Sequence, residues 1–152
     1  FSIVFWKNVE ANREEMLKKC PRVDFYVSCT LSAFNHDHVV DFHQDWTDKG
    51  YIQYKDWNMN VVQDPMHYRI DILPDTIKQK TIEKYKAHVD KFKPYDTLGR
   101  AVEGFNSGIN MMQATDNTKY LEKFKKYTEL LDVRRQQKTV EIFPELKEVL
   151  DV

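Results

Sequence analysis

Residues 23–35, VDFYVSCTLSAFN, alternate apolar and polar side chains with a period of two. The apolar row consists of Val23, Phe25, Val27, Cys29 and Leu31. The other row carries hydroxyls and a carboxylate, on Asp24, Tyr26, Ser28, Thr30 and Ser32. Residues 57–62 repeat the pattern, with Trp57, Met59 and Val61 alternating with Asn58, Asn60 and Val62. This period predicts two strands, each with one dry face and one wet face.

Segments with the periodicity of a helix lie before, between and after these strands. Residues 1–20 form an amphipathic pattern that Pro21 ends, and Asn35 is placed to cap a second helix that Gly50 stops. Residues 66–74, MHYRIDILP, read as a short third strand ending at Pro74. Beyond it, further helices are predicted over residues 77–92, 98–112 and 121–131, with a turn and a short helix in IFPELKEVL.

The order helix, strand, helix, strand predicts an α/β fold with parallel strands and crossover helices. We expect a partial (half) (β/α) barrel over residues 1–74, followed by a helical C-terminal part, residues 75–152, packed on it as a single compact unit. In such a barrel the dry rows meet the helices and the polar rows line a shared interior. The alternative is a compact α+β interaction module.

The polar rows supply the candidate site. We expect five side chains to face a substrate or cofactor: Tyr26, Ser28, Thr30, Asn58 and Asn60. Small hydroxyls and amides can orient a ligand without bringing charge, although such groups also satisfy one another or buried water. The chain has no nucleophile elbow, phosphate-binding glycine loop or dinucleotide fingerprint, and contains only four glycines. No catalytic residue is therefore assigned.

Histidines and cysteines raise the question of a metal site. His36, His38 and His43 are separated by two and five positions, which places them about 200° and about 140° apart around a helix. A solvated helix face is therefore favoured over metal ligation. The two cysteines, Cys20 and Cys29, suit reduced, buried thiols better than a disulfide or a metal pair. We expect no metal in this chain.

Composition narrows the class of protein. The chain has 152 residues, 41% of them hydrophobic and 31% charged, which suits one globular domain. Its net charge of −1 argues against nucleic acid or an anionic membrane as a partner. There is neither an apolar run long enough to span a membrane nor a signal peptide, so we expect a cytoplasmic protein. The chain starts at Phe1 inside an amphipathic pattern, which suggests truncation.

Three segments together resemble the C-terminal portion of twitch-type radical S-adenosylmethionine (radical SAM) proteins. They are FWKNVEANREEMLKKCPRVDFYVSCTLSAFN, NMNVVQDPMHYRIDILPDTIKQK and LLDVRRQQKTVEIFPELKEV. The most specific pieces are TLSAFN at a strand end, ILPDTIK leading into a helix, and LDVRR followed by FPEL. The resemblance covers most of the chain. It implies a full or partial (β/α) barrel whose polar strand rows lie beside the cofactor or substrate.

The resemblance also implies a [4Fe-4S] cluster and S-adenosylmethionine in the full-length family, with the cluster held by a CxxxCxxC motif. This chain lacks that motif, and Cys20 and Cys29 cannot supply three ligands. We therefore expect a fragment of a radical SAM-type oxidoreductase that is inactive alone. Its partner would be the missing N-terminal half or a second copy in a homodimer or other oligomer. The alternative is a stand-alone binding or protein-interaction module.

Overall fold

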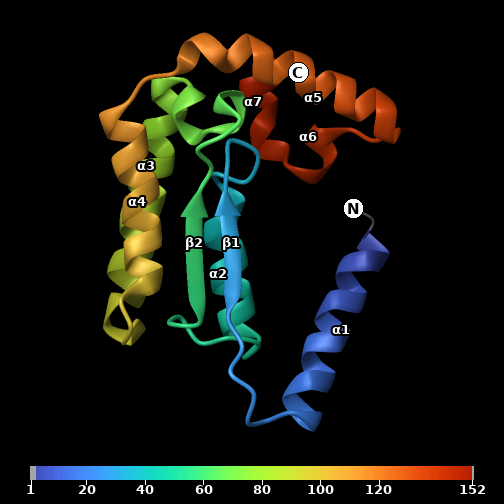
Figure 1. The fold of residues 1–152 in the computed structure, drawn as a ribbon, viewed down its shortest axis with the longest axis vertical. Helices are drawn as coiled ribbons and strands as arrows, with labels where there is room; N and C mark the ends of the chain where they lie inside the picture. Colours follow the sequence, from blue (N-terminus) through green and yellow to red (C-terminus); the bar gives the residue numbers. More distant parts are fainter. Residues whose placement is uncertain (1–2, 152) are drawn as a thin grey trace.

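The computed structural model describes the backbone of residues 3–151, which is mainly helical around one small sheet (Figure 1). The strands are β1 (Val27–Leu31) and β2 (Trp57–Val61). The helices are α1 (Ile3–Lys19), α2 (His38–Asp48), α3 (Asp75–Phe92), α4 (Arg100–Ala114), α5 (Leu121–Arg135), α6 (Thr139–Ile142) and α7 (Lys147–Leu150). Short 3-10 turns lie at Met66–Tyr68, Ile70–Ile72, Lys93–Tyr95, Thr118–Tyr120 and Pro144–Leu146.

The two strands are parallel neighbours. Val27 pairs with Trp57, and the register continues to Leu31 with Val61. α2 connects them and lies behind the sheet in Figure 1, and this crossover is right-handed, as parallel connections almost always are. The parallel pairing expected from the order of elements is therefore observed.

α4 runs alongside β2 and depends on two glycines. A Cβ atom at Gly104 would lie 2.8 Å from Cβ of Met59 and 3.4 Å from the backbone N and O of that residue. A Cβ atom at Gly108 would lie 2.8 Å from Cδ2 of Leu31 and 3.2 Å from Cε2 of Tyr85. Only residues without a side chain allow the helix to approach the strands this closely. α4 thus covers the far edge of β2.

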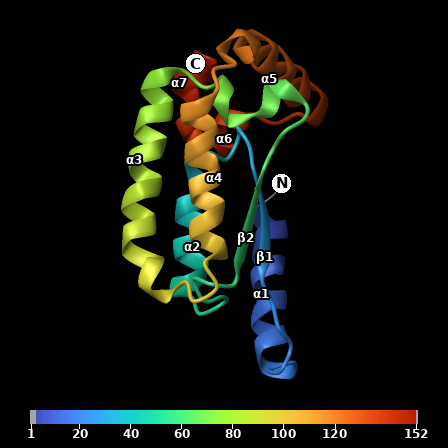
Figure 2. The same ribbon diagram turned by 60° about the vertical axis from the view of Figure 1, so that its left-hand side comes forward.

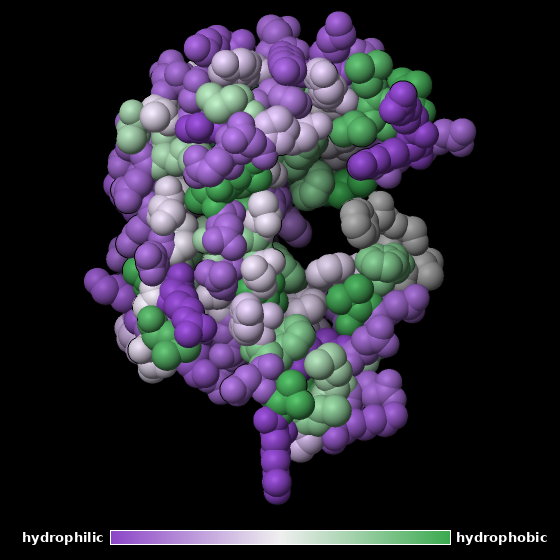
Figure 3. Space-filling view, in the orientation of Figure 1, coloured by the Kyte–Doolittle hydropathy of each residue, from purple (hydrophilic) through white to green (hydrophobic). Residues whose placement is uncertain are grey.

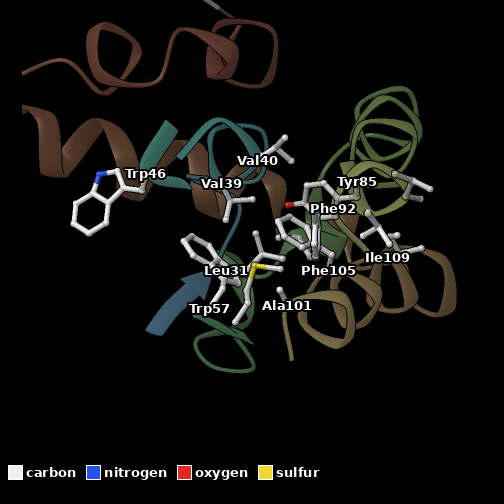
Figure 4. Packing of buried hydrophobic residues seen from close by; sticks show 14 of the residues in the cluster. Leu31, Val39, Val40, Trp46, Trp57, Tyr85, Phe92, Ala101, Phe105 and Ile109 are labelled. Carbon is white, nitrogen blue, oxygen red and sulfur yellow. The ribbon is translucent and has the colours of Figure 1, made fainter. Parts of the chain in front are cut away.

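The first hydrophobic core lies between the dry face of the sheet and the helices α2, α3 and α4 (Figure 4). Leu31 and Trp57 enter it from the strands, and both are completely buried. Tyr85 and Phe92 come from α3, and Phe105 comes from α4. The apolar rows read from the sequence therefore supply the strands' contribution to this core, except Val23, which precedes β1 and is exposed.

The second hydrophobic core lies at the carboxyl ends of the strands, where the C-terminal helices gather (Figure 2). Its buried members are Ala33, Ile72, Leu73, Ile77, Phe124, Leu146 and Val149. Ile70 belongs to the first core and Ile72 to the second, so residues 70–73 lie between the two.

α1 is attached mainly through its contacts with α2 and the loop after it. The ring of Trp6 lies 5.5 Å from the ring of Phe42 and 5.6 Å from that of Trp46, centroid to centroid. The guanidinium of Arg13 donates two hydrogen bonds, of 2.9 and 2.7 Å, to the carbonyl oxygen of Tyr51. In Figures 1 and 2, α1 runs antiparallel to β1 and forms an arm at the side of the molecule.

The prediction of a half barrel is wrong. The residues described contain two strands and no third, because two 3-10 turns, Met66–Tyr68 and Ile70–Ile72, form in place of the strand predicted over residues 66–74. Their alternation does not mark two faces of a strand, since Ile70, Asp71, Ile72 and Leu73 are all buried. Beyond β2 the neighbouring element is α4, which occupies the edge that another barrel strand would need.

A histidine pair is buried in the first core. His43 Nε2–H donates to the carbonyl oxygen of Tyr54 at 3.1 Å, which leaves Nδ1 to accept a hydrogen bond from His88 Nε2 at 2.9 Å. Burial lowers the pKa of His43 to about 4. Burial, and then the proximity of His43, lower the pKa of His88 to about 3. Both rings are therefore neutral near pH 7.

The substitution Gly104→Ala tests the approach of α4 to β2. We expect it to lower the free energy of unfolding by about 1–3 kcal/mol, because the new methyl group meets Met59, whose Cβ and backbone cannot easily move. Alanine's better helix propensity, about 1 kcal/mol, offsets only part of this. Urea denaturation measures the change. The matched control is Asn106→Ala at an exposed position of α4, and equal stability of Gly104→Ala and wild type would contradict the packing.

The histidine pair predicts acid sensitivity. The unfolded chain takes up protons at these histidines below about pH 6.5, whereas the folded chain resists protonation down to about pH 4. The free energy of unfolding should therefore fall as the pH drops from about 6.5 to about 4, and these two groups contribute no change above that window. Urea midpoints measured across it should vary less in His88→Gln. The control His38→Gln, at an exposed position, should keep the wild-type profile.

Candidate functional site

Four of the five predicted side chains meet on one face of the sheet. The register pairs Ser28 with Asn58 and Thr30 with Asn60, so the four form a compact square of hydroxyls and amides. They point away from the first core because the alternating residues of both strands, such as Cys29 and Met59, point into it. Period two along each strand and the parallel register together produce this arrangement.

This polar face is open to solvent. Ser28, Thr30 and Asn60 are exposed and Asn58 is half-buried, while Tyr26, just before β1, is 58% exposed. The expectation that the polar rows line a shared interior is wrong for the described part of the chain, because the helices that contact the sheet pack on its other face or at the edge of β2. A parallel sheet is ordinarily buried on both faces, which makes an open polar face unusual.

Helix α4 adds a charged border to the polar face. A shallow hollow between β2 and α4 is lined by Asn58, Met59, Asn60, Arg100, Glu103, Gly104 and Ser107. Sequence reasoning missed the α4 residues. Arg100, Glu103 and Ser107 follow a spacing of three and four, which places them on one helix face, but that pattern is also typical of any solvated helix. Only the approach of Gly104 to Met59 brings them beside the asparagines.

The polar face is suited to binding through hydrogen bonds. Within residues 3–151, the side chains of Ser28, Thr30, Asn58 and Asn60 make no hydrogen bond to another protein group. Their donors and acceptors are therefore available to a ligand or to another polypeptide. None of the four is a general base or an activated nucleophile, so the face can orient a bound group but does not by itself supply catalysis.

The cysteines do not fit a metal cluster. Cys29 lies on the buried side of β1, and burial raises the pKa of its thiol to about 12, so it is protonated at neutral pH. Cys20 is exposed just after α1, so the prediction of a buried thiol is wrong for this residue. Two thiols cannot provide the three thiolates that the radical SAM cluster requires. No group of three or more histidine, cysteine or acidic residues within the described structure is arranged to hold a metal ion.

The three histidines after β1 have separate environments. His36 is buried, its Nδ1 lies 2.9 Å from the carbonyl oxygen of Ala33, and burial lowers its pKa. His38 is exposed at the start of α2, while His43 is buried with His88. The prediction of a solvated helix face is therefore wrong for His36 and His43. The sequence carries the signal for His43, which lies on the same face of α2 as the buried Val39 and Trp46.

Asn35 has a different role from the one predicted. It does not cap α2 with its side chain, since α2 begins at His38. Its side-chain Oδ1 accepts a hydrogen bond from the backbone N–H of Ser32 at 2.8 Å, and its Nδ2 donates to the carbonyl oxygen of Thr30 at 3.0 Å. The amide thus binds the backbone at the carboxyl end of β1.

Comparisons with known proteins returned no match: no family model fits the chain, and neither the curated proteins nor the solved structures contain a significant relative. Among the described residues, no helix has the length and apolar character needed to cross a membrane.

The two thiols should differ in reactivity. With a disulfide reagent at about pH 8, Cys20 should react quickly, whereas Cys29 should react about a hundredfold more slowly or not at all, because its thiolate fraction is small and its access is limited. The release of the coloured product gives both rates. Cys20→Ser should remove the fast phase and Cys29→Ser the slow phase. Two fast phases in the folded wild type would contradict the burial of Cys29.

Proposed function

We propose that the chain is the C-terminal part of a radical SAM-type oxidoreductase and that it is not catalytic alone. The observation that carries this proposal is the open polar face of a parallel strand pair, with its square of Ser28, Asn58, Thr30 and Asn60. In the proposed role, these side chains and Tyr26 face the substrate or cofactor held by another portion of the protein.

The second core adds support. Three of the most specific pieces of the resemblance, TLSAFN, ILPDTIK and FPEL, contribute to it, through Ala33, Ile72, Leu73, Ile77 and Leu146, whereas LDVRR does not. These segments are far apart along the chain yet pack together at the carboxyl ends of the strands. Their order in the sequence therefore corresponds to one structural unit, which is what a shared ancestral fold would require.

The cofactors are proposed for the portion that carries CxxxCxxC, not for this chain. Cys20 and Cys29 do not form a cluster site, for the reasons given above, so no chemical step is assigned to residues of this chain. Its contribution would be to orient a bound group by uncharged hydrogen bonds on the polar face. Arg100 and Glu103, at the border of that face, add one charge of each sign.

A stand-alone binding module is the second candidate function. The hollow between β2 and α4 favours it, because Asn58, Asn60, Arg100 and Ser107 offer donors and acceptors to a small polar ligand within one chain. This module would need no cluster-bearing portion and would bind its ligand as the isolated chain.

Metal content separates the two candidates. We expect the isolated chain to stay colourless and free of iron after anaerobic reconstitution with iron and sulfide. The product of the complete reading frame should contain CxxxCxxC and bind about four iron atoms per cluster. The matched control is the complete product with Cys20→Ser and Cys29→Ser, which should retain its iron. Stoichiometric iron in the isolated chain, or a complete reading frame without CxxxCxxC, would contradict the radical SAM proposal.

A further inference from the structure

The two edges of the sheet differ. α4 covers the outer edge of β2, whereas the outer edge of β1 faces away from the first core and toward α1 (Figure 1). In the space-filling view, the molecule is hollowed on the side of the strand-containing body that faces α1 (Figure 3). The backbone of β1 is therefore accessible along this side.

Hydrogen bonds identify which backbone groups lie on the open edge. The N–H of Val27 donates to the carbonyl oxygen of Asp56, and the carbonyl oxygen of Leu31 accepts from the N–H of Val62, both at 2.9 Å. Backbone N–H and C=O groups of alternate residues point to opposite sides of a strand. Val27, Cys29 and Leu31 therefore direct these groups toward β2, and Ser28 and Thr30 direct theirs toward the outer edge of β1. In the described part of the chain, the N–H and C=O of Ser28 and the N–H of Thr30 have no hydrogen-bond partner.

Asn35 already occupies the carboxyl end of this edge. Its amide binds the carbonyl oxygen of Thr30 and the N–H of Ser32, as the backbone of a neighbouring strand would. A neighbouring strand could therefore pair with β1 up to Thr30 and would end there. The remaining groups, on Ser28 and Thr30, match a short strand in both spacing and hydrogen-bonding capacity.

The position of α1 indicates the direction and source of that strand. α1 runs antiparallel to β1 and packs against α2, just as α2 runs antiparallel to β2 (Figures 1 and 2). In the unit β1–α2–β2, the strand before the helix lies beside the strand after it. If α1 is also a right-handed crossover helix, the strand before α1 lies on the open edge of β1 and is parallel to it.

We propose that the outer edge of β1 pairs in parallel with a strand that directly precedes α1 in the encoded polypeptide. This strand lies along the outer edge of β1, where it accepts hydrogen bonds from the N–H groups of Ser28 and Thr30 and donates one to the carbonyl oxygen of Ser28. The proposal depends only on the unpaired outer edge of β1 and on the direction and packing of α1. It therefore holds whether or not the protein is a radical SAM enzyme.

Amide hydrogen exchange, measured by NMR, tests the proposal. Two samples are compared: residues 1–152, and the same residues extended by about 15 residues encoded directly before Phe1. An extension of this length is enough for a strand and a loop. In the extended chain, the amide hydrogens of Ser28 and Thr30 should exchange at least about tenfold more slowly than in the chain without the extension. The amides of Val27 and Leu31, directed toward β2, serve as internal references. An extension with the same residues in scrambled order should give no protection.

Three results would overturn the proposal. The first is unchanged exchange at Ser28 and Thr30 in the extended chain, and the second is a reading frame that encodes nothing before α1. The third is protection in the printed chain that grows with protein concentration, which would assign the edge to a second copy. Iron binding by the complete product is scored separately. Protection of the Ser28 and Thr30 amides in a product that binds no iron would support the neighbouring strand and contradict the radical SAM proposal. Iron binding without this protection would support the radical SAM proposal and contradict the neighbouring strand.

Discussion

The close approach of α4 to β2 is the constraint on which the rest of the structure depends. Gly104 and Gly108 let the helix lie against Met59, Leu31 and Tyr85, and this contact closes one edge of the sheet. α3 and α2 then complete the cover of the dry face, so that Trp57 and Leu31 are fully buried. With one face and one edge closed, a sheet of two strands has only its polar face and the edge of β1 left open.

A buried carboxylate holds the end of α4 in place. Asp71 accepts hydrogen bonds from Thr115 at 2.5 Å, Arg69 at 2.7 Å and Asn117 at 2.8 Å. Burial alone would raise the pKa of Asp71, but these hydrogen bonds outweigh it and lower the pKa overall. The charged carboxylate thus joins residues 69–71 to the segment after α4, because a buried charge without these partners would cost several kcal/mol.

The polar face and the open edge of β1 are two consequences of one incomplete sheet. Ser28 and Thr30 belong to both, since their side chains lie on the polar face and their backbone groups point out of the edge. A strand beside β1 would therefore extend the polar face at the same time as it satisfied the edge. This link connects the proposed ligand-facing role of Tyr26, Ser28, Thr30, Asn58 and Asn60 to the proposed neighbouring strand.

The sequence by itself determined the features that depend on local period and connectivity. Alternation over residues 23–32 and 57–62 is enough to predict two strands and their faces, although the first strand begins only at Val27. The single helix between them makes parallel pairing the expected outcome. The positions of α3, α4 and α5 follow from helical periodicity in the same way. The count of two cysteines excludes a three-thiolate site whatever the fold.

The tertiary structure decided which elements meet. Residues 66–74 alternate like a strand, yet their side chains divide between two cores, and no local pattern reveals that. Likewise, Arg100 and Glu103 border the polar face only because two glycines admit α4, and His43 meets His88 only because α2 and α3 share one core. These contacts join residues distant in sequence, so they depend on shape complementarity in the folded chain and not on the spacing of residues within one segment.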